Sequence, residues 1–489
     1  MSLNYAAIGR ILGFISIILG IAMAPSLFIS LAMKEGAAAV AFIATILPLL
    51  SAGYFLTLKV RPASAPLRLR DGFLVVALCW ITASLAGSLP YLISGAATHP
   101  ADAIFESTSS FTTTGATVFN DVESLPKGLL FWRSFSQWLG GMGILLFAVS
   151  ILPALGISGQ IIARAETPGP TLTKMAPKMA DSARLIYLMY GGLTLLQILL
   201  LLLGKMSLFD ACVFAFGSAS SAGLTNYNDG AAHFSSPYIQ GIISLFSLFA
   251  CVNFGLYYTL AKGKIRQFFR DSELRAFLFI LVGAFLLISG NLLLKGVYGS
   301  PWEALESGFF HAASFLTTTG HVTADIAAWP SFSQVILVTL MFIGGCSSST
   351  GGGLKVVRVV VLIKLIRRGI YRRLHPRAVV PVKLQGKIIS ADTVSGIAAF
   401  IVTYFLVFLM GTLILSLEPF DFLTALTASA AALGNIGTGF GIMGSDAVYS
   451  MFSPWAKLFL SLLMLIGRLE LFTILLLFTP SFWNPDRQY

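Results

Sequence analysis

Long apolar stretches recur along the whole chain and are separated by short polar segments. A helix needs roughly 20 mostly apolar residues to cross the hydrocarbon core of a bilayer, and ten stretches approach or exceed that length. They are residues 8–33, 37–58, 72–94, 129–152, 185–203, 236–260, 276–294, 332–362, 391–417 and 456–478. The pattern predicts an all-α integral membrane protein with ten spans.

Composition agrees with this class, since 56% of the residues are hydrophobic and only 11% are charged, against about 25% charged in soluble chains. The first span is too long for a signal peptide and lacks a small-residue cleavage site, so we expect it to be retained.

Cys79, Cys212, Cys251 and Cys346 lie in apolar stretches without CxxC spacing, which predicts buried free thiols. Without a soluble domain or a nucleophile–base constellation, an enzyme is the least favoured class.

The net charge of +11 is compatible with nucleic-acid binding, but the distribution of the basic residues indicates membrane topology instead. Most of them fall in four polar segments, 59–70, 164–184, 262–275 and 364–387, which lie on alternate loops. Such loops are typically cytoplasmic. With an even number of spans, both termini are then cytoplasmic. Anionic membrane lipid or an acidic protein partner can bind these loops in addition.

Four of the opposite loops share one order of residues: an acid, a half-apolar segment and then small residues with a glycine. They contain FTTTGAT (111–117), SSAGLTN (220–226), FLTTTGH (315–321) and GNIGTGFG (434–441). Aligned on Gly115, Gly223, Gly320 and Gly437, they recur at intervals of 108, 97 and 117 residues. This repetition predicts four structural repeats.

The segment between each acid and its glycine is too short to cross a membrane. Asp102, Asp210, Glu303 and Asp421 precede the glycines by 13 to 17 residues, which leaves about three helical turns. An acid suits the positive end of a helix dipole, so we predict four re-entrant half-helices that enter from outside and turn back.

The loops that follow these half-helices would lie at membrane depth, where irregular backbone must be buried in protein or line a water-filled cavity. Glycine allows successive carbonyls to face one axis, and four such loops can replace the hydration shell of an ion. Tight helix packing by small residues is the alternative. It explains a single loop better than it explains four in register.

These loops, with AETPGP (165–170), GGCSSSTGGGLK (344–355) and GRLELFT (467–473), resemble the Trk/Ktr/HKT superfamily of potassium transporters, and specifically bacterial TrkH-type membrane subunits, over essentially the whole chain. The resemblance implies four covalently joined helix–pore-loop–helix units around one pseudo-fourfold pore, after two additional N-terminal helices. The expected divisions are residues 1–70 for the N-terminal pair, and 71–164, 165–270, 271–378 and 379–489 for the pore repeats.

The resemblance also implies partners and a location. It predicts a homodimer in the bacterial inner membrane that docks a cytoplasmic TrkA-type nucleotide-binding ring. The regulatory nucleotide would bind that partner, because this chain shows neither a Walker lysine pattern nor a Rossmann unit. Potassium is the expected ion.

In that family, glycine at all four filter positions accompanies potassium selectivity, whereas serine in the first repeat accompanies sodium permeation. The four loops differ around their glycines, which predicts weaker discrimination than four identical loops would give. The expected selectivity-filter residues are Thr113, Thr114, Gly115, Ala222, Gly223, Thr318, Thr319, Gly320, Asn435, Ile436 and Gly437.

The run 344–355 interrupts the predicted inner helix of the third repeat. It holds five glycines in twelve residues, and glycine costs about 1 kcal/mol relative to alanine in a helix. A simple kink is the plainer interpretation. The resemblance implies an intramembrane gate beneath the filter, moved by the partner ring through loop 364–387. The gate loop comprises Gly344, Gly345, Cys346, Ser347, Ser348, Ser349, Thr350, Gly351, Gly352 and Gly353.

Arg468 is the single charge in the middle of the last predicted span. A charge there costs roughly 2.5–3.5 kcal/mol on insertion scales, which marks a functional position. Glu470, two residues further, faces another side of the helix. We therefore expect Arg468 to face the pore or the gate loop, with a purely structural bond to loop carbonyls as the alternative.

Polar residues beyond the glycines are open to two interpretations. His321 is predicted to be solvated at the pore mouth, with a pH-sensitive effect on conduction as the alternative. Asp121, Asp229, Asp325 and Asp446 follow their glycines by 5 to 9 residues. They form an acidic vestibule that concentrates cations, or they are solvated loop acids.

Two transport mechanisms fit the sequence. The first is a gated, channel-like potassium uptake subunit. The second is a proton- or sodium-coupled potassium symporter with alternating access. Four repeats in the same direction, without a carboxylate relay in the spans, favour the first.

Overall fold

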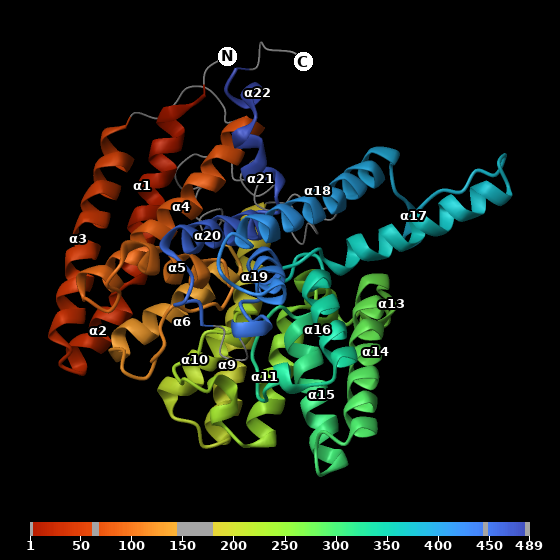
Figure 1. The fold of residues 1–489 in the computed structure, drawn as a ribbon. Coiled ribbons are helices and arrows are strands. Elements are labelled where there is room, and N and C mark those ends of the chain that lie inside the picture. The colour runs from red at the N-terminus through yellow and green to blue at the C-terminus, as the bar shows by residue number, and fades with distance from the viewer. Residues whose placement is uncertain (1–2, 61–67, 144–178, 444–447, 485–489) are drawn as a thin grey trace.

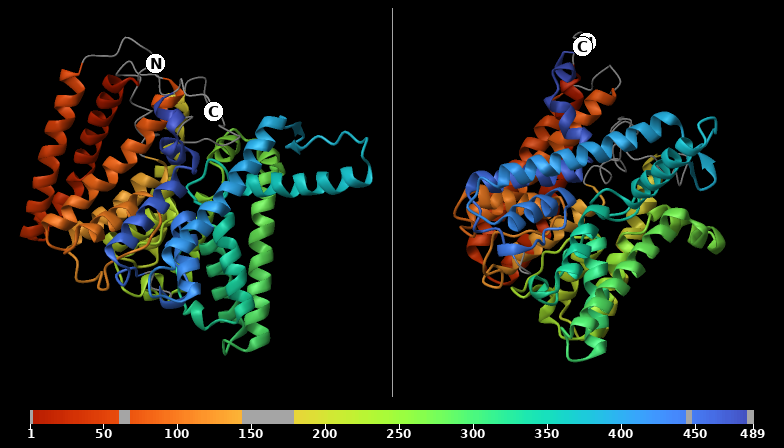
Figure 2. Two further views of the ribbon diagram at one scale, coloured as in Figure 1. Left: turned by 45° about the horizontal axis from the view of Figure 1, so that its top comes forward. Right: turned by 45° about the vertical axis from the view of Figure 1, so that its right-hand side comes forward.

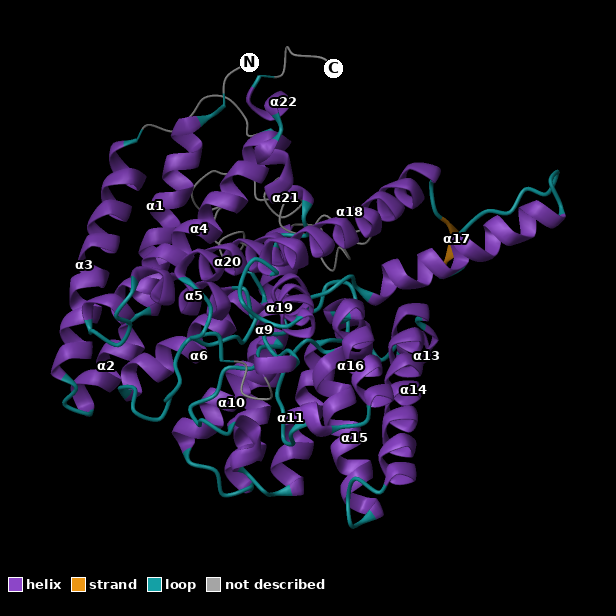
Figure 3. Cartoon of the chain, in the orientation of Figure 1, coloured by secondary structure: helices purple, strands orange, loops and turns teal. Residues whose placement is uncertain are grey.

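The computed structural model describes residues 3–60, 68–143, 179–443 and 448–484, and this part of the chain is almost entirely helical. The motif at 165–170 and Asp446 lie outside these residues. The two strands in the described ranges, β1 (Lys383–Leu384) and β2 (Lys387–Ile388), form a small antiparallel hairpin (Figure 3). The helical class predicted from the sequence is confirmed.

Six helical segments of the described chain are long and apolar enough to cross a membrane. Two further helix pairs reach that length but bend sharply, by 92° between α11 (Pro237–Ala250) and α12 (Phe254–Ala261), and by 114° after α20 (Pro454–Arg468). The six are α1 with α2 (Tyr5–Ala32), α3 (Gly36–Lys59), α4 (Leu69–Ile93), α9 (Met179–Leu203), α14 (Ser272–Lys295) and α18 (Ala391–Leu415). The protein is therefore a helical membrane protein.

The two remaining predicted spans are not single helices in the described chain. The span expected at 129–152 begins with α6 (Lys127–Gly141) and continues into residues outside the described ranges. The span expected at 332–362 is divided into α16 (Ser331–Ile343) and α17 (Val356–Leu374), because the glycine-rich run between them adopts no regular structure. That run breaks the helix, as its composition predicts.

Each of the four repeated segments contains a short helix with the acid at its start. The lengths are 12, 13, 16 and 13 residues. Asp102, Asp210 and Glu303 lie in the first turn of their helices, and Asp421 is the N-cap. These helices are α5 (Pro100–Phe111), α10 (Leu208–Ser220), α15 (Pro301–Leu316) and α19 (Phe422–Gly434). Short helices are therefore present at the four predicted places, with the acids where the helix dipole favours them.

The longer helices surround the four short ones, and α17 projects away from the rest of the molecule (Figures 1 and 2). The N-terminal helices α1 to α3 lie along one edge, and α17 extends outward on the opposite side together with the β1–β2 hairpin. α1 and α3 approach closely at Gly13 and Gly53, where a Cβ on either residue would lie 2.6 Å from the other helix. Small residues at such crossings allow the van der Waals packing that holds membrane helices together.

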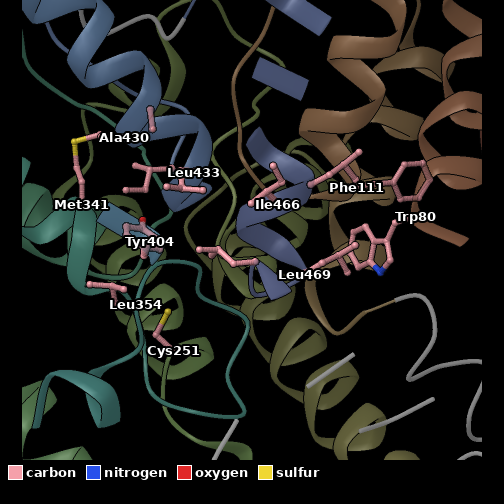
Figure 4. Close-up of a cluster of buried hydrophobic side chains, with 14 of the residues drawn as sticks. Trp80, Phe111, Cys251, Met341, Leu354, Tyr404, Ala430, Leu433, Ile466 and Leu469 are labelled. Atoms are coloured by element: carbon pink, nitrogen blue, oxygen red, sulfur yellow. The ribbon is translucent and has the colours of Figure 1, made fainter. Parts of the chain in front are cut away.

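Buried apolar side chains fill the space where the short helices end (Figure 4). Trp80 and Phe111 contribute from α4 and α5, and Leu433 contributes from α19. Ile466 and Leu469, at the end of α20, belong to the same cluster as Tyr404 and Met341. This packing fixes the positions from which the glycine loops start.

Candidate ion-conduction site

All four short helices end in the same C-terminal capping hydrogen bond. The N–H of the residue before each glycine donates to a carbonyl five residues earlier, as in a Schellman motif. The four bonds are Thr114 N to Ser109 O (2.9 Å), Ala222 N to Gly217 O (2.9 Å), Thr319 N to Ser314 O (3.0 Å) and Ile436 N to Ala431 O (2.9 Å). The loops therefore leave their helices in equivalent directions despite different sequences.

The residue two positions before each glycine is left-handed. Thr113, Ser221, Thr318 and Asn435 have φ of 55°, 58°, 58° and 54°. Asparagine tolerates this region, but a β-branched threonine does so at a cost of roughly 1–3 kcal/mol. Because such strain persists only where the surroundings impose it, the common conformation marks these loops as a candidate functional site.

Gly115, Gly223, Gly320 and Gly437, which we call the glycine ring, contact one another in sequence order. A Cβ on Gly115 would lie 2.5 Å from Gly223 N, and one on Gly223 would lie 2.6 Å from Thr319 O. A Cβ on Gly320 would overlap the Ile436 carbonyl, and one on Gly437 would lie 2.6 Å from Ala116 N. The four loops thus close on themselves, and the predicted filter segments meet at one place.

The second loop departs from the other three. Gly115, Gly320 and Gly437 have φ of 84°, 73° and 80°, which favours glycine. Gly223 is not in the positive-φ region, so the close approach of Thr319 alone excludes a side chain there. The predicted difference between the loops therefore extends to their backbone conformation.

A cavity of about 350 Å³ opens beside the glycine ring. Gly115, Gly223 and Gly320 line it, together with Asp229 and Asp325. Two of the four acids considered for a vestibule therefore reach this cavity. Asp121 does not line it; its carboxylate accepts a hydrogen bond from Asn228 (3.0 Å), which lowers the pKa of Asp121.

The prediction that His321 is solvated is wrong. The residue lines the cavity but is only 3% exposed, because its ring stacks on Phe214 from the preceding repeat at a centroid distance of 5.9 Å. Its carbonyl accepts a hydrogen bond from Ser314 Oγ (2.6 Å). The histidine therefore packs within the protein between two repeats.

The gate loop, residues 344–353, lies against the glycine loops. Its Thr350 shares a hydroxyl–hydroxyl bond of 2.7 Å with Ser221, and Gly352 N donates to Thr318 Oγ1 at 2.7 Å. A Cβ on Gly352 would overlap the Gly434 carbonyl at the end of α19. The segment thus contacts the second, third and fourth repeats on the helix-end side of the ring.

Two charged side chains, Glu273 and Lys355, hold this segment in place. Glu273, in the first turn of α14, accepts from Ser347 N and Ser347 Oγ, both at 2.6 Å, and from Val357 N at 3.2 Å. Lys355 Nζ donates to the Gly351 carbonyl. The loop is irregular, yet its position is set by specific hydrogen bonds.

Arg468 links the gate loop to the first repeat. Its guanidinium donates to Thr350 O (2.9 Å) and to Gly140 O and Gly141 O (both 2.6 Å) at the end of α6. The structure agrees in part with both interpretations of this arginine. The side chain faces the gate loop, as the first predicts, and it donates to backbone carbonyls, as the second predicts. Glu470 pairs instead with Arg358 of α17. The expected reason, a different side of one helix, does not apply, because α20 ends at Arg468 and Glu470 lies in the bend that follows.

Comparison with known proteins places this arrangement in a family. Residues 38–484 match the TrkH family, described as a cation transport protein. The chain belongs to the TrkH family. It is 39% identical to the Trk system potassium uptake protein TrkH of Vibrio parahaemolyticus and 37% identical to that of Salmonella typhimurium, covering 99% of this chain and 100% of each relative.

A solved TrkH-family structure agrees with the fold. The crystal structure of the potassium transporter TrkH from Vibrio parahaemolyticus superposes with a TM-score of 0.89 at 36% identity, over 99% of this chain and 100% of that one. The family consists of transporters and not of enzymes. The sequence resemblance is therefore confirmed.

The structure adds a buried ion pair that sequence reasoning did not identify. Glu106 of α5 is 0% exposed and pairs with Arg133 of α6. The carboxylate also accepts from Thr117 Oγ1 and from Val118 N (2.9 Å), while Arg133 donates to Thr225 O (2.7 Å) in the second loop. One charge pair thus fixes the outer ends of two neighbouring loops. A second acid in α5, beyond Asp102 of the first turn, is the signal in the sequence that points to it.

Two other glycine loops are hydrogen-bonded to their preceding short helices at the position equivalent to Val118. The N–H three residues after the glycine donates to a side chain of the preceding half-helix in three repeats, from Val118 to Glu106, from Thr323 to His311 (3.3 Å) and from Phe440 to Thr427 (3.0 Å). His311 can accept because its Nδ1 donates to Ser307 O (2.7 Å). A glutamate, a histidine and a threonine therefore accept the same backbone hydrogen bond. Because the three residue types differ, alignment of the repeat sequences does not reveal this shared role.

Proposed function

We propose that this chain is the potassium-translocating subunit of a bacterial Trk-type uptake system, with conduction through the glycine ring. The closed contact of four glycine loops in a TrkH-family chain carries the proposal. Backbone carbonyls and hydroxyls of these loops would replace the ion's hydration shell. The potassium sites are assigned to Thr114, Gly115, Gly223, Thr319, Gly320 and Gly437.

The proposal includes four pore repeats within ten spans, of which the four equivalent short helices support the repeats. The basic segments would face the cytoplasm of the bacterial inner membrane, together with both termini. Asp229 and Asp325 would then lie on the outer side, where the cavity beside the ring concentrates cations. The half-helices would point their negative ends toward the ion.

Regulation is assigned to residues 344–353 as the gate. The segment contacts three repeats directly and the first repeat through Arg468, so its displacement would open the path on the inner side of the ring. A TrkA-type nucleotide-binding ring would move it through the basic segment 364–387, which the sequence predicts as a loop but which comprises the second half of α17 and most of the β1–β2 hairpin. Nucleotide would bind that partner, and a homodimer is the proposed assembly.

Uptake in cells that lack their own potassium uptake tests the function. Cells that express this chain with its partner ring should accumulate labelled potassium, with little loss when sodium is added in excess. Equal uptake of both ions would disprove selectivity while leaving the pore in place. A reversal potential that follows the potassium gradient alone supports a channel, whereas one that shifts with a proton or sodium gradient supports the symporter.

The Arg468→Gln variant tests the gate. Glutamine cannot reach the three carbonyls that the guanidinium joins, and hydrogen bonds to charged groups contribute about 1.5–3 kcal/mol. We expect basal potassium flux into proteoliposomes without the partner ring to rise about tenfold or more, with unchanged preference over sodium. Unchanged flux would indicate a purely structural arginine. Arg367→Gln, on exposed α17, is the control and should have no effect.

A further inference from the structure

A second, larger cavity lies away from the glycine ring, beside the helix that follows the gate loop. Its volume is about 1180 Å³, and α12, α13 (Ile265–Arg270), the first turn of α14, the start of α17 and the β1–β2 hairpin surround it. α13 and α14 lie next to the root of α17 (Figure 1). Six basic side chains line the cavity: Lys264, Arg266, Arg270, Arg275, Lys364 and Lys387.

The two carboxylates in this cavity are already engaged by other groups. Asp271 accepts from Glu273 N and Leu274 N, both at 2.9 Å, and from the side chain of Gln385. Glu273 is occupied by the gate loop. Within the described ranges none of the six basic side chains forms an ion pair with a carboxylate. With six basic side chains against two carboxylates, the lining of the cavity is electropositive.

We propose that this cavity binds a phosphate-bearing anion, which is the headgroup of an anionic phospholipid or a soluble phosphate compound. Arginine and lysine clusters match phosphate in charge and hydrogen-bond geometry. The concave shape and volume suit a small ligand better than the surface of a folded protein. α13 also exposes Ile265 (57%) and Phe269 (61%) close to these bases, and this pairing of apolar and basic groups is typical of the membrane interface.

The cavity is connected to the gate loop through Glu273. This residue and Ser347 both line it, and they are joined by two hydrogen bonds of 2.6 Å. An anion in the cavity would compete with the Glu273 carboxylate for electrostatic attraction to the basic side chains. Anion binding in the cavity and the strength of the hydrogen bonds between Glu273 and Ser347 are therefore linked. This coupling rests on the proposed role of 344–353 as the gate, whereas binding itself does not.

Binding is tested on the purified full-length chain in nanodiscs of phosphatidylcholine. One arm adds phosphatidylglycerol to the bilayer and counts retained lipid by native mass spectrometry; the other adds labelled pyrophosphate to neutral nanodiscs. Since each basic residue contributes about 1 kcal/mol near a membrane surface, the double variant Arg270→Gln, Arg275→Gln should bind roughly thirtyfold more weakly. Arg270→Lys, Arg275→Lys should retain most of the affinity.

The matched control removes the same charge from a different place. Arg372 and Arg373 are exposed near the end of α17, about 12 Å further along the helix than Lys364. Charges that far away are largely screened, so Arg372→Gln, Arg373→Gln should bind like the unmodified chain. An equal loss in both double variants would overturn the proposal, as would absence of binding in both arms or binding of an acidic partner protein alone.

The two arms distinguish the source of the phosphate, and flux distinguishes the coupling. Retention of phosphatidylglycerol alone identifies a lipid site, and pyrophosphate binding alone identifies a soluble ligand. Potassium flux into proteoliposomes should change when the bound anion is supplied, and the Arg270→Gln, Arg275→Gln variant should not show that change. If the chain conducted no potassium, binding would still be measurable, so failure of the function and failure of the site give different results.

Discussion

Replacement of Gly320 by alanine is expected to reduce potassium uptake by about tenfold or more. Gly320 has φ of 73°, a conformation that costs other residues roughly 1–3 kcal/mol, and 1.36 kcal/mol corresponds to about tenfold in rate. The added methyl group would also overlap the Ile436 carbonyl. The third and fourth loops must then separate, which displaces two neighbouring sets of oxygens in the proposed potassium sites.

The control for this variant is Gly290→Ala. Gly290 lies in α14 with φ outside the positive range, and an added methyl group would meet no atom within 4 Å, so alanine should be accepted there without loss of uptake. The two variants add the same methyl group and differ in its surroundings. Uptake and the potassium-to-sodium ratio should be measured at matched membrane expression. Normal, selective uptake by Gly320→Ala would exclude the third loop from the conduction path.

Much of this site is local in sequence and could therefore be predicted. The half-helices begin at acids and end before glycines, and both features depend on neighbouring residues. The irregular run 344–355 follows directly from its glycine content. In each case the chain carries its own signal within one or two helical turns.

Other features depend on contacts between distant parts of the chain and carry little local signal. The breaks at residues 251–253 and 469–471 contain neither glycine nor proline, yet the helices bend there by 92° and 114°. The one local signal at the first break is Asn253, whose side chain caps α12 by accepting from Gly255 N. Glu470 and Leu471 even adopt φ of 53° and 56°, which sequence alone would not suggest. His321 is polar and follows a glycine, but Phe214, which lies in the preceding repeat, buries it. Tertiary packing overrides local preference at these places.

Substitution of Glu106 by glutamine is expected to destabilise the protein by about 3–5 kcal/mol, the usual cost of breaking a buried ion pair. The change leaves Arg133, which is 2% exposed, without its counter-charge. It also places an amide N–H₂ at one of the two oxygen positions, where it meets either the Arg133 donor at Oε1 or the Val118 N donor at Oε2. Since the same guanidinium donates to Thr225 O, the first and second loops should loosen together.

Denaturant unfolding in detergent micelles measures this loss, with Asp121→Asn as the control. That variant makes the same chemical change at an exposed acid whose carboxylate accepts from the Asn228 side chain, so the stability should change little. The double variant Glu106→Gln, Arg133→Gln should be less destabilised than the sum of the two single variants, because it leaves no unpaired charge behind. Additive losses would mean that the two residues act separately. Reduced potassium selectivity in Glu106→Gln, at a temperature where it remains folded, would show that the ion pair also holds the filter in register.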